Sequence, residues 1–235
     1  MNNKFQIAVD GPVAAGKGTV CRLVAERLGI LYVDTGAMYR VAAMVAMSAG
    51  VDFQDEEKLV PLIKSADIQL KIPQENEKDG RLLTILLDGK DVSWQIRTEI
   101  VGHGSSQVAK LAGVRQALVK KQQDIAENQS VVMEGRDITY RVLPDAKLKI
   151  YLTGSDLVRA KRRHQQLLGK GRDLSFEEVR KDLLQRDHDD TTREHDPLQI
   201  VSDAWVIDTS DMPIGKVVSM IIDRVKAIIS SNKHE

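Results

Sequence analysis

The sequence predicts an α/β fold in which helices cover both faces of a parallel sheet, and two observations lead to that prediction. First, five short apolar runs rich in β-branched residues each end in small or acidic residues, as strands buried on both faces do. Second, helical patterns separate these runs, and such alternation is typical of this class. A chain of 235 residues can bury a substantial core in one large domain or two small ones.

The elements follow one another in a regular order. The predicted strands are 5–10, 30–34, 131–134, 148–153 and 204–208. The predicted helices are 19–28, 37–49, a pair between about 96 and 127, then 156–168, 176–186 and 214–229. The segment 67–92 breaks the alternation, because it reads as two or three antiparallel strands around the turn signals Asp79-Gly80 and Asp88-Gly89. Since no linker rich in Ser and Gly separates this insertion, we expect one domain over residues 1–235.

Composition restricts the partners and the location. Lys plus Arg (34) balances Asp plus Glu (34), so the chain has no overall attraction to nucleic acid or to an anionic membrane. The single cysteine, Cys21, excludes an internal disulfide and suits a reducing cytoplasm. The longest uncharged apolar stretch, 41–51, is shorter than the about 20 residues that a bilayer requires. The apolar run before Asp10 is too short for the core of a signal peptide. We expect a cytoplasmic protein that binds neither nucleic acid nor membrane.

The stretch GPVAAGKGT, residues 11–19, joins the first strand to the first helix. Backbone N–H groups and the positive end of a helix dipole can surround a phosphate there, and Lys17 adds a point charge. The strand–loop–helix context favours this reading over a glycine-containing turn with a surface lysine. The general pattern has a hydroxyl residue directly after the lysine, whereas Gly18 stands here and the hydroxyl follows at Thr19. The predicted ATP-binding residues are Gly11, Pro12, Val13, Ala14, Ala15, Gly16, Lys17, Gly18 and Thr19.

Arginines follow two of the predicted strands. Arg40 comes soon after the second strand and Arg136 directly after the third. Ligands bind at the carboxyl ends of the strands in open parallel sheets. A lone arginine would be interpreted as a surface salt bridge, but two of them beside a phosphate loop favour a binding role.

A basic segment follows the fourth strand. Residues 157–172 hold six basic residues and no acid, and the i, i+3, i+4 spacing of Arg159, Arg162 and Arg163 places these three on one helical face. The glycines that follow suggest a hinge, so we predict an arginine-bearing lid over phosphates; the alternative is a solvated basic helix.

Farther along the chain, Arg186, Asp190 and Arg193 share a face if the next helix extends that far. Two arginines around a carboxylate could hold a ribose and a phosphate. The alternative is a salt-bridge ladder, which the spacing does not exclude.

The sequence shows no residue pattern for metal binding or for a serine or cysteine nucleophile. The five histidines show no metal-ligand spacing, Cys21 falls in the first helix where a buried small hydrophobe is expected, and no Gly-x-Ser-x-Gly turn is present. Phosphoryl transfer needs positioning and charge neutralisation and no covalent protein nucleophile, so this pattern is compatible with it.

Together these segments resemble the bacterial cytidylate kinase family from about Phe5 to the C-terminal helix. The resemblance is carried by DGPVAAGKGT, VDTGAMYR, IRTEIVGHGSSQVA, VRQAL, EGRDI, PDAKLKIYLT, RAKRR and RDHDDTTR. It implies a P-loop kinase three-layer sandwich with a parallel five-stranded sheet, a small antiparallel insertion (about 64–104) that binds the nucleoside monophosphate, and a helical lid (about 157–173). It also implies ATP-dependent phosphorylation of CMP and dCMP in pyrimidine nucleotide metabolism, with Mg²⁺ held mainly through ATP phosphates and water. We expect a monomer.

The resemblance also assigns residues. Gly16, Lys17, Gly18 and Thr19 would hold the ATP phosphates, and Arg159, Arg162 and Arg163 would close on the transferring phosphoryl group. The CMP-binding residues would be Thr35, Arg40, Arg136 and Arg193 for the phosphate, Arg186 and Asp190 for the ribose, and Ser106, Arg115 and Asp137 for the base. An arginine donor with an aspartate acceptor complements the edge of cytosine, whereas uracil reverses part of that pattern.

The chain departs from the family pattern at a few positions. Val13 and Ala14 stand where the family usually has Ser and Gly, Thr139 and Tyr140 replace a Gly-Thr pair, and Asp196 replaces an alanine. Two alternative functions stay open. The first is a kinase for another monophosphate, UMP or AMP. The second is a P-loop nucleotide-binding protein without kinase activity, against which the missing Asn-Lys-x-Asp motif and the acceptor-side arginines stand.

Overall fold

The computed structural model describes residues 4–77, 79–81, 83–169 and 171–231. Lys170, one of the six residues of the basic segment, lies outside this set. The contacts between residues divide the chain into two compact units. The insertion unit comprises Lys4 and residues 30–131, and the phosphate-loop unit comprises residues 5–29 and the chain from 132 onward. Whether they form the single predicted domain, with the insertion and lid bounds given above, stays a prediction.

The parallel sheet contains all five predicted strands. They are β1 (Gln6–Asp10), β2 (Leu31–Asp34), β6 (Val131–Gly135), β7 (Leu148–Thr153) and β8 (Trp205–Asp208), in the order β2-β6-β1-β7-β8. In the phosphate-loop unit β7 runs parallel to β1, with Ile7 opposite Leu148, and β8 runs parallel to β7, with Ile150 opposite Trp205. The predicted fold class is therefore confirmed.

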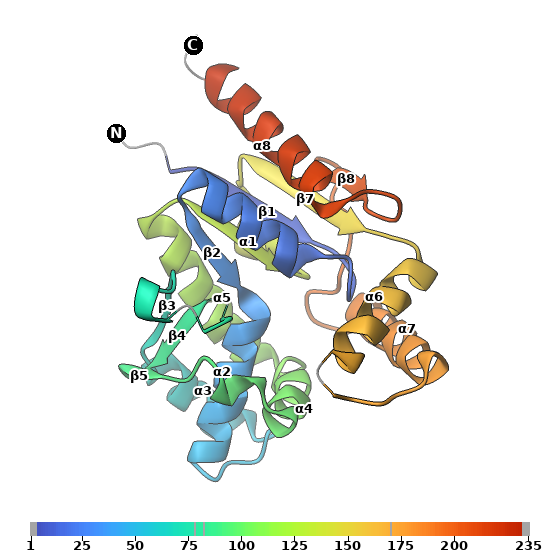
Figure 1. Cartoon of the computed structure of the whole chain (residues 1–235). Coiled ribbons are helices and arrows are strands. Elements are labelled where there is room, and N and C mark those ends of the chain that lie inside the picture. The colour runs from blue at the N-terminus through green and yellow to red at the C-terminus, as the bar shows by residue number, and fades with distance from the viewer. Residues whose placement is uncertain (1–3, 78, 82, 170, 232–235) are drawn as a thin grey trace. The chain divides into compact units, whose positions relative to one another are not determined.

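Two helices cover one face of these strands. Figure 1 shows α1 (Lys17–Leu28) and α8 (Ile214–Ser231) side by side there, and the two helices are in contact. Each helix buries residues at i and i+4 spacing, such as Val20 and Val24 on α1 and Val217 and Ile221 on α8. Cys21 is buried among them, as predicted.

A helical hairpin completes the phosphate-loop unit. Helix α6 (Asp156–Leu168) begins at the N-cap Ser155 and has the predicted bounds. Helix α7 (Phe176–Thr192) begins with a capping box formed by Ser175 and Glu178 and runs six residues past its predicted end, because no Gly or Pro interrupts the pattern before Pro197. A π-helical turn, η3 (Ile138–Val142), follows β6.

The insertion unit combines helices with a small antiparallel sheet, as predicted. The sheet has the order β3 (Ile68–Lys71), β4 (Thr84–Leu87), β5 (Lys90–Asp91). Asp88 and Gly89 join β4 to β5 with φ of 50° and 77°, the left-handed conformation that an Asp-Gly turn favours. Asp79-Gly80 lies instead in the longer connection from β3 to β4. The helices are α2 (Thr35–Ser48), α3 (Glu56–Ser65), α4 (Glu99–Val108) and α5 (Ala112–Asn128), with short 3₁₀ turns at Glu75–Glu77 and Gln95–Arg97.

Helix α3 was not predicted. Its two buried residues, Leu59 and Ile63, have helical i, i+4 spacing, but Pro61 lies between them and is a residue that usually breaks a helix interior. The cap that starts it is nevertheless present, because the Asp55 side chain accepts a hydrogen bond from the Lys58 N–H.

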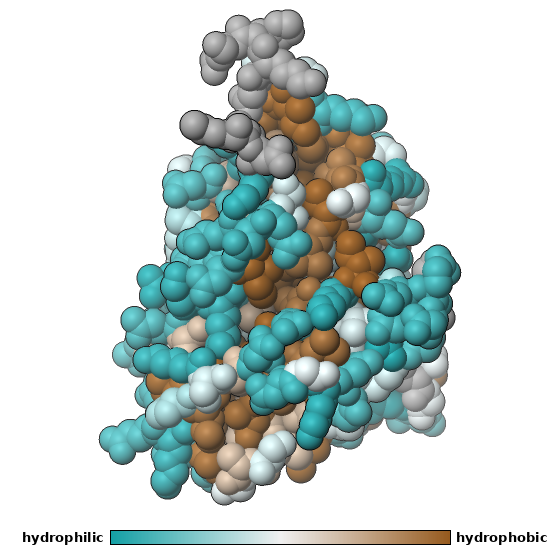
Figure 2. All heavy atoms as spheres, turned by 90° about the vertical axis from the view of Figure 1, so that its left-hand side faces the viewer, coloured by the Kyte–Doolittle hydropathy of each residue, from teal (hydrophilic) through white to brown (hydrophobic). Residues whose placement is uncertain are grey.

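Hydrophilic and apolar side chains are interspersed on the face drawn in Figure 2. Among the helices of the described ranges, none has both the length and the apolarity to cross a bilayer.

Candidate active site

The phosphate loop has a backbone that demands particular residues. A Cβ on Gly11 would lie 2.0 Å from the carbonyl oxygen of Leu152 on β7, so only glycine fits there. Gly16 caps α1 with a φ of 95°. Ala14 also has a positive φ, 59°, at the position where the family pattern has glycine. An L-residue with a Cβ is disfavoured in this conformation by about 1–2 kcal/mol, so the surroundings must hold the loop in its shape.

Side chains hold the carbonyl oxygens of the loop. Lys17 Nζ donates to the oxygens of Gly11 (2.7 Å) and Pro12 (2.9 Å). The Val13 oxygen accepts a hydrogen bond from Arg159 Nη1 (3.0 Å), and the Ala15 oxygen accepts one from Thr209 Oγ1 (3.2 Å). Four of the five carbonyl groups from residue 11 to residue 15 therefore accept hydrogen bonds from side chains.

Lys17 is a buried cation with a displaced pKa. Burial lowers its pKa to about 8, and the nearby Arg136 acts in the same direction. Glu134 and Asp10 act in the opposite direction, as does Asp190. Lys17 thus titrates near pH 8, and an anion that binds beside it would favour the charged form.

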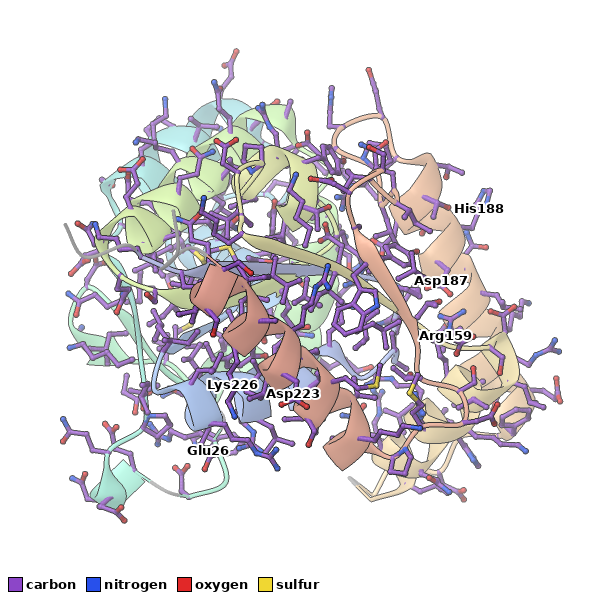
Figure 3. The ribbon with its side chains drawn as sticks, turned by 90° about the horizontal axis from the view of Figure 1, so that it is seen from above. Glu26, Arg159, Asp187, His188, Asp223 and Lys226 are labelled. Carbon is purple, nitrogen blue, oxygen red and sulfur yellow. The ribbon has the colours of Figure 1, made fainter. Side chains whose placement is uncertain are left out.

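The three predicted lid arginines have different surroundings. Arg159 is buried, and it donates to the oxygens of Gly154 and Val13 and to two carboxylates, those of Asp156 and Asp187. Figure 3 shows Arg159 on α6 and Asp187 on the neighbouring α7. The other two are less buried.

Arg162 donates to Thr209 Oγ1 (2.8 Å) and to the Thr209 carbonyl oxygen (2.6 Å). Arg163 donates to Gln166 (2.7 Å) on its own helix. The spacing of the three arginines therefore did not indicate that one of them is fixed in the protein interior.

Four predicted acceptor-side residues of the phosphate-loop unit lie together. Arg136 Nε donates to Asp190 (2.6 Å), and Arg193 lies 3.8 Å from an oxygen of Asp137 and 4.0 Å from one of Asp190. Arg186 belongs to a different pair, because its side chain is 55% exposed and lies 3.8 Å from Asp182 one turn earlier. Residues 186, 190 and 193 therefore do not form one connected group. Helix α7 ends at Thr192, just before Arg193, and Arg186 pairs with Asp182 and not with Asp190.

The insertion unit carries the other four acceptor-side residues. Thr35 is the buried first residue of α2, and Arg40 on the same helix donates to the Ile96 oxygen (3.4 Å). Ser106 is exposed on α4. Arg115 is only 2% exposed, lies 5.6 Å from the centre of the Tyr39 ring and donates to the Ala109 oxygen.

Three residues without a predicted site role, Asp10, Thr139 and Tyr140, organise the site. Asp10, at the end of β1, accepts hydrogen bonds from Ile138 N (2.9 Å), Thr139 N (2.8 Å) and Thr139 Oγ1 (2.7 Å), and so holds η3 beside the start of the phosphate loop. Burial raises its pKa and these bonds oppose the rise. Tyr140 donates to the Pro197 oxygen (2.6 Å).

Two of these residues, Thr139 and Tyr140, are departures from the family pattern, and both have partners. The third, Asp10, carried a signal in the sequence, since it is an acid that ends an apolar strand.

These features define a P-loop nucleotide-binding protein: a strand, a glycine-containing loop and a helix around a buried lysine. Among the described residues, no group of three or more His, Cys, Asp or Glu side chains is arranged to hold a metal ion.

The comparisons narrow this class. The family model for cytidylate kinase matches residues 7–227. A cytidylate kinase of Pelotomaculum thermopropionicum is 44% identical over 97% of this chain and 98% of its own length, and one of Bacillus subtilis is 42% identical over 96% and 98%. The chain belongs to the cytidylate kinase family. An uncharacterized protein from Eubacterium ventriosum has a similar fold, with a TM-score of 0.55 over 95% of this chain and 99% of its own at 11% identity.

Proposed function

We propose that this protein transfers the γ-phosphoryl group of ATP to CMP, giving ADP and CDP. The observation that carries the proposal is the buried Lys17 at the phosphate loop of a chain that belongs to the family from residue 7 to 227. In this reaction the bond from the γ-phosphorus to its bridging oxygen breaks, and a bond to an oxygen of the CMP phosphate forms. That acceptor is already an anion at neutral pH, so no strong general base is needed and the protein acts by positioning and charge neutralisation.

On the donor side, residues 11–19 surround the ATP phosphates. Their carbonyl groups are held by side chains, which leaves the loop fixed before the nucleotide arrives. Lys17 neutralises charge that builds up on the transferring group, and Arg162 and Arg163 add to it from α6. Arg159 is set apart from these two by its burial and its protein partners.

On the acceptor side, we propose the residues that the family pattern gives. Thr35, Arg40, Arg136 and Arg193 bind the CMP phosphate, Arg186 and Asp190 the ribose, and Ser106, Arg115 and Asp137 the base. Two ion pairs, Arg136–Asp190 and Arg193–Asp137, support this assignment. They place four of the proposed CMP-binding side chains next to one another in the phosphate-loop unit. The 2′-hydroxyl of the ribose is only one of the CMP groups that these residues would contact. We therefore propose dCMP, which lacks this hydroxyl, as a second substrate.

A magnesium ion fits this chain only as a companion of ATP. The described residues contain no cluster that would hold it alone, but Thr19 is exposed in the first turn of α1 and can contribute its hydroxyl. Bound in this way, through ATP phosphates and water, the ion would neutralise phosphate charge. We further propose a monomer that works in the cytoplasm in pyrimidine nucleotide metabolism and binds no nucleic acid or membrane.

A panel of monophosphates tests the function. ADP release from ATP would be measured with CMP, dCMP, UMP and AMP in turn, and CMP should give the highest kcat/KM, since Arg115 and Asp137 complement cytosine. Equal or better turnover of AMP or UMP would favour the alternative of a different monophosphate kinase. ATP binding without transfer to any of the four would indicate a nucleotide-binding protein without kinase activity.

A further inference from the structure

Three elements of the phosphate-loop unit meet at one residue of the loop, Val13. Its N–H donates to Asp187 Oδ1 on α7 (3.1 Å), and its carbonyl oxygen accepts from Arg159 Nη1 on α6 (3.0 Å). Arg159 Nη1 also donates to Asp187 Oδ2, which closes a ring of three hydrogen bonds. We call this arrangement the Val13 ring; Figure 3 shows its two charged members on their helices.

Arg159 has little capacity left for a substrate. Its side chain is 4% exposed, and four of its five N–H groups are directed at protein acceptors: Gly154 O from Nε, Val13 O and Asp187 from Nη1, and Asp156 from Nη2. To reach a phosphate, the guanidinium would have to leave two carboxylates and two carbonyl oxygens behind. Its partners therefore keep it in contact with the loop.

Asp187 is engaged in the same way. Its side chain is 17% exposed, and each carboxylate oxygen has one member of the ring as its partner. A backbone N–H and a guanidinium bonded to one carboxylate give charge-assisted hydrogen bonds, which are stronger than neutral ones. The ring thus fixes both polar groups of the Val13 peptide backbone.

The backbone conformation of the next residue, Ala14, indicates the role of the Val13 ring. Ala14 has a φ of 59°, and a strained backbone conformation persists only where the surroundings over-determine it. Val13 directly precedes Ala14, so fixing its N–H and carbonyl group restricts the torsions that Ala14 must adopt. Without the ring, Ala14 is free to relax to negative φ, and the loop would lose the shape in which its N–H groups meet a phosphate.

We propose that Arg159 and Asp187 are positioning residues which hold the phosphate loop in its ATP-binding shape through Val13. Arg159 acts through the loop and does not touch the transferring phosphoryl group, whereas Arg162 and Arg163 remain the arginines that do. The proposal deepens the ATP site and rests on the proposed function for the identity of its ligand.

The test is a rescue experiment. Asp187→Asn keeps an acceptor for the Val13 N–H but weakens the bond to Arg159, so the Kd for ATP, measured in the absence of CMP, should rise about tenfold while KM for CMP changes less than about twofold. In the double variant, Ala14→Gly should restore the Kd to within about threefold of the wild-type value, because glycine adopts positive φ without strain.

The control is Asp189→Asn, which changes an exposed neighbour on α7 that accepts a hydrogen bond from Gln185 on the same helix. The Kd should not change in this variant. An unchanged Kd in Asp187→Asn, or a rise that Ala14→Gly does not reduce, would overturn the proposal.

A second variant covers the case in which Asp187→Asn fails to fold. Arg159→Lys keeps the charge, but an ammonium group cannot bond to all the acceptors that the planar guanidinium reaches. This variant should therefore also raise the Kd for ATP, and Ala14→Gly should rescue it. A fall in kcat of about a hundredfold or more with an unchanged Kd would instead make Arg159 a catalytic residue. Because the Kd is measured on ATP alone, failure of the wild-type protein to phosphorylate CMP would count against the proposed function and leave this test intact.

Discussion

The two units hold their buried cations in different ways. In the phosphate-loop unit, Lys17 lies against carbonyl oxygens of its own loop and in the field of nearby carboxylates and Arg136, and burial lowers its pKa to about 8. In the insertion unit, Arg115 stacks on the Tyr39 ring and donates to a backbone carbonyl group. A lysine can lose its proton when buried, whereas an arginine keeps its charge and presents a fixed set of donors. The difference agrees with the proposed roles, in which Lys17 meets a charge that changes during the reaction and Arg115 recognises a fixed pattern of acceptors on the base.

The largest expected effect is that of Lys17→Ala. Under the proposed function this cation neutralises phosphate charge in a buried site, so kcat/KM should fall by about 10³-fold or more. The fold should survive, since burial disfavours the charged form of Lys17 and its removal relieves that cost. Steady-state kinetics and thermal unfolding measure the two effects. Lys216→Ala, an exposed position on α8, is the control. Retained activity in Lys17→Ala would show that this loop is not the catalytic one.

Arg115→Met should give a smaller and more selective effect. Methionine keeps much of the apolar volume over Tyr39 but removes every donor, so KM for CMP should rise about thirtyfold while KM for ATP stays within about twofold. The comparison with Lys120→Met, an exposed cation on the same helix, separates base reading from a general effect on α5. Equal rises in both KM values would remove Arg115 from base reading and make it a structural cation of the insertion unit.

The sequence predicted the elements whose signals are local. The five strands of the parallel sheet are continuous apolar runs, and α6 begins at a serine cap, so both could be located in the sequence. Helix α3 was not predicted, because Pro61 lies within it and proline usually breaks a helix interior. The end of α7 was placed too early because no residue marks it before Pro197.

Some residues of the candidate site could likewise be predicted from the sequence, and others could not. Lys17 and its loop follow from a motif, since the chemistry needs those residues at that spacing. Asp187 and Asp10 were not assigned roles because several of their partners are backbone N–H groups, those of Val13, Ile138 and Thr139, and residue identity does not reveal a backbone partner. Arg186 is a different case: its spacing from Asp190 is that of one helical face, and in the structure its ion pair is formed with Asp182.

Proton uptake gives the smallest effect and the sharpest contrast between the two cations. The folded pKa of Lys17, about 8, lies below the ordinary value of 10.5, so the folded protein binds this proton less tightly than the unfolded chain does. Its burial therefore costs stability at low pH, and that cost disappears as the pH rises from about 8 to about 10.5. A phosphate beside Lys17 favours the charged form and raises the pKa again.

ATP binding at pH 8.5 should consequently take up roughly half a proton or more, and less at pH 7, where Lys17 is already charged. Calorimetry in two buffers of different ionisation enthalpy measures the uptake. Lys17→Arg retains a cation that cannot lose its proton and should show none. An uptake as large in Lys17→Arg as in the wild type would assign the proton to another group, and the contrast between Lys17 and Arg115 would then rest on geometry alone.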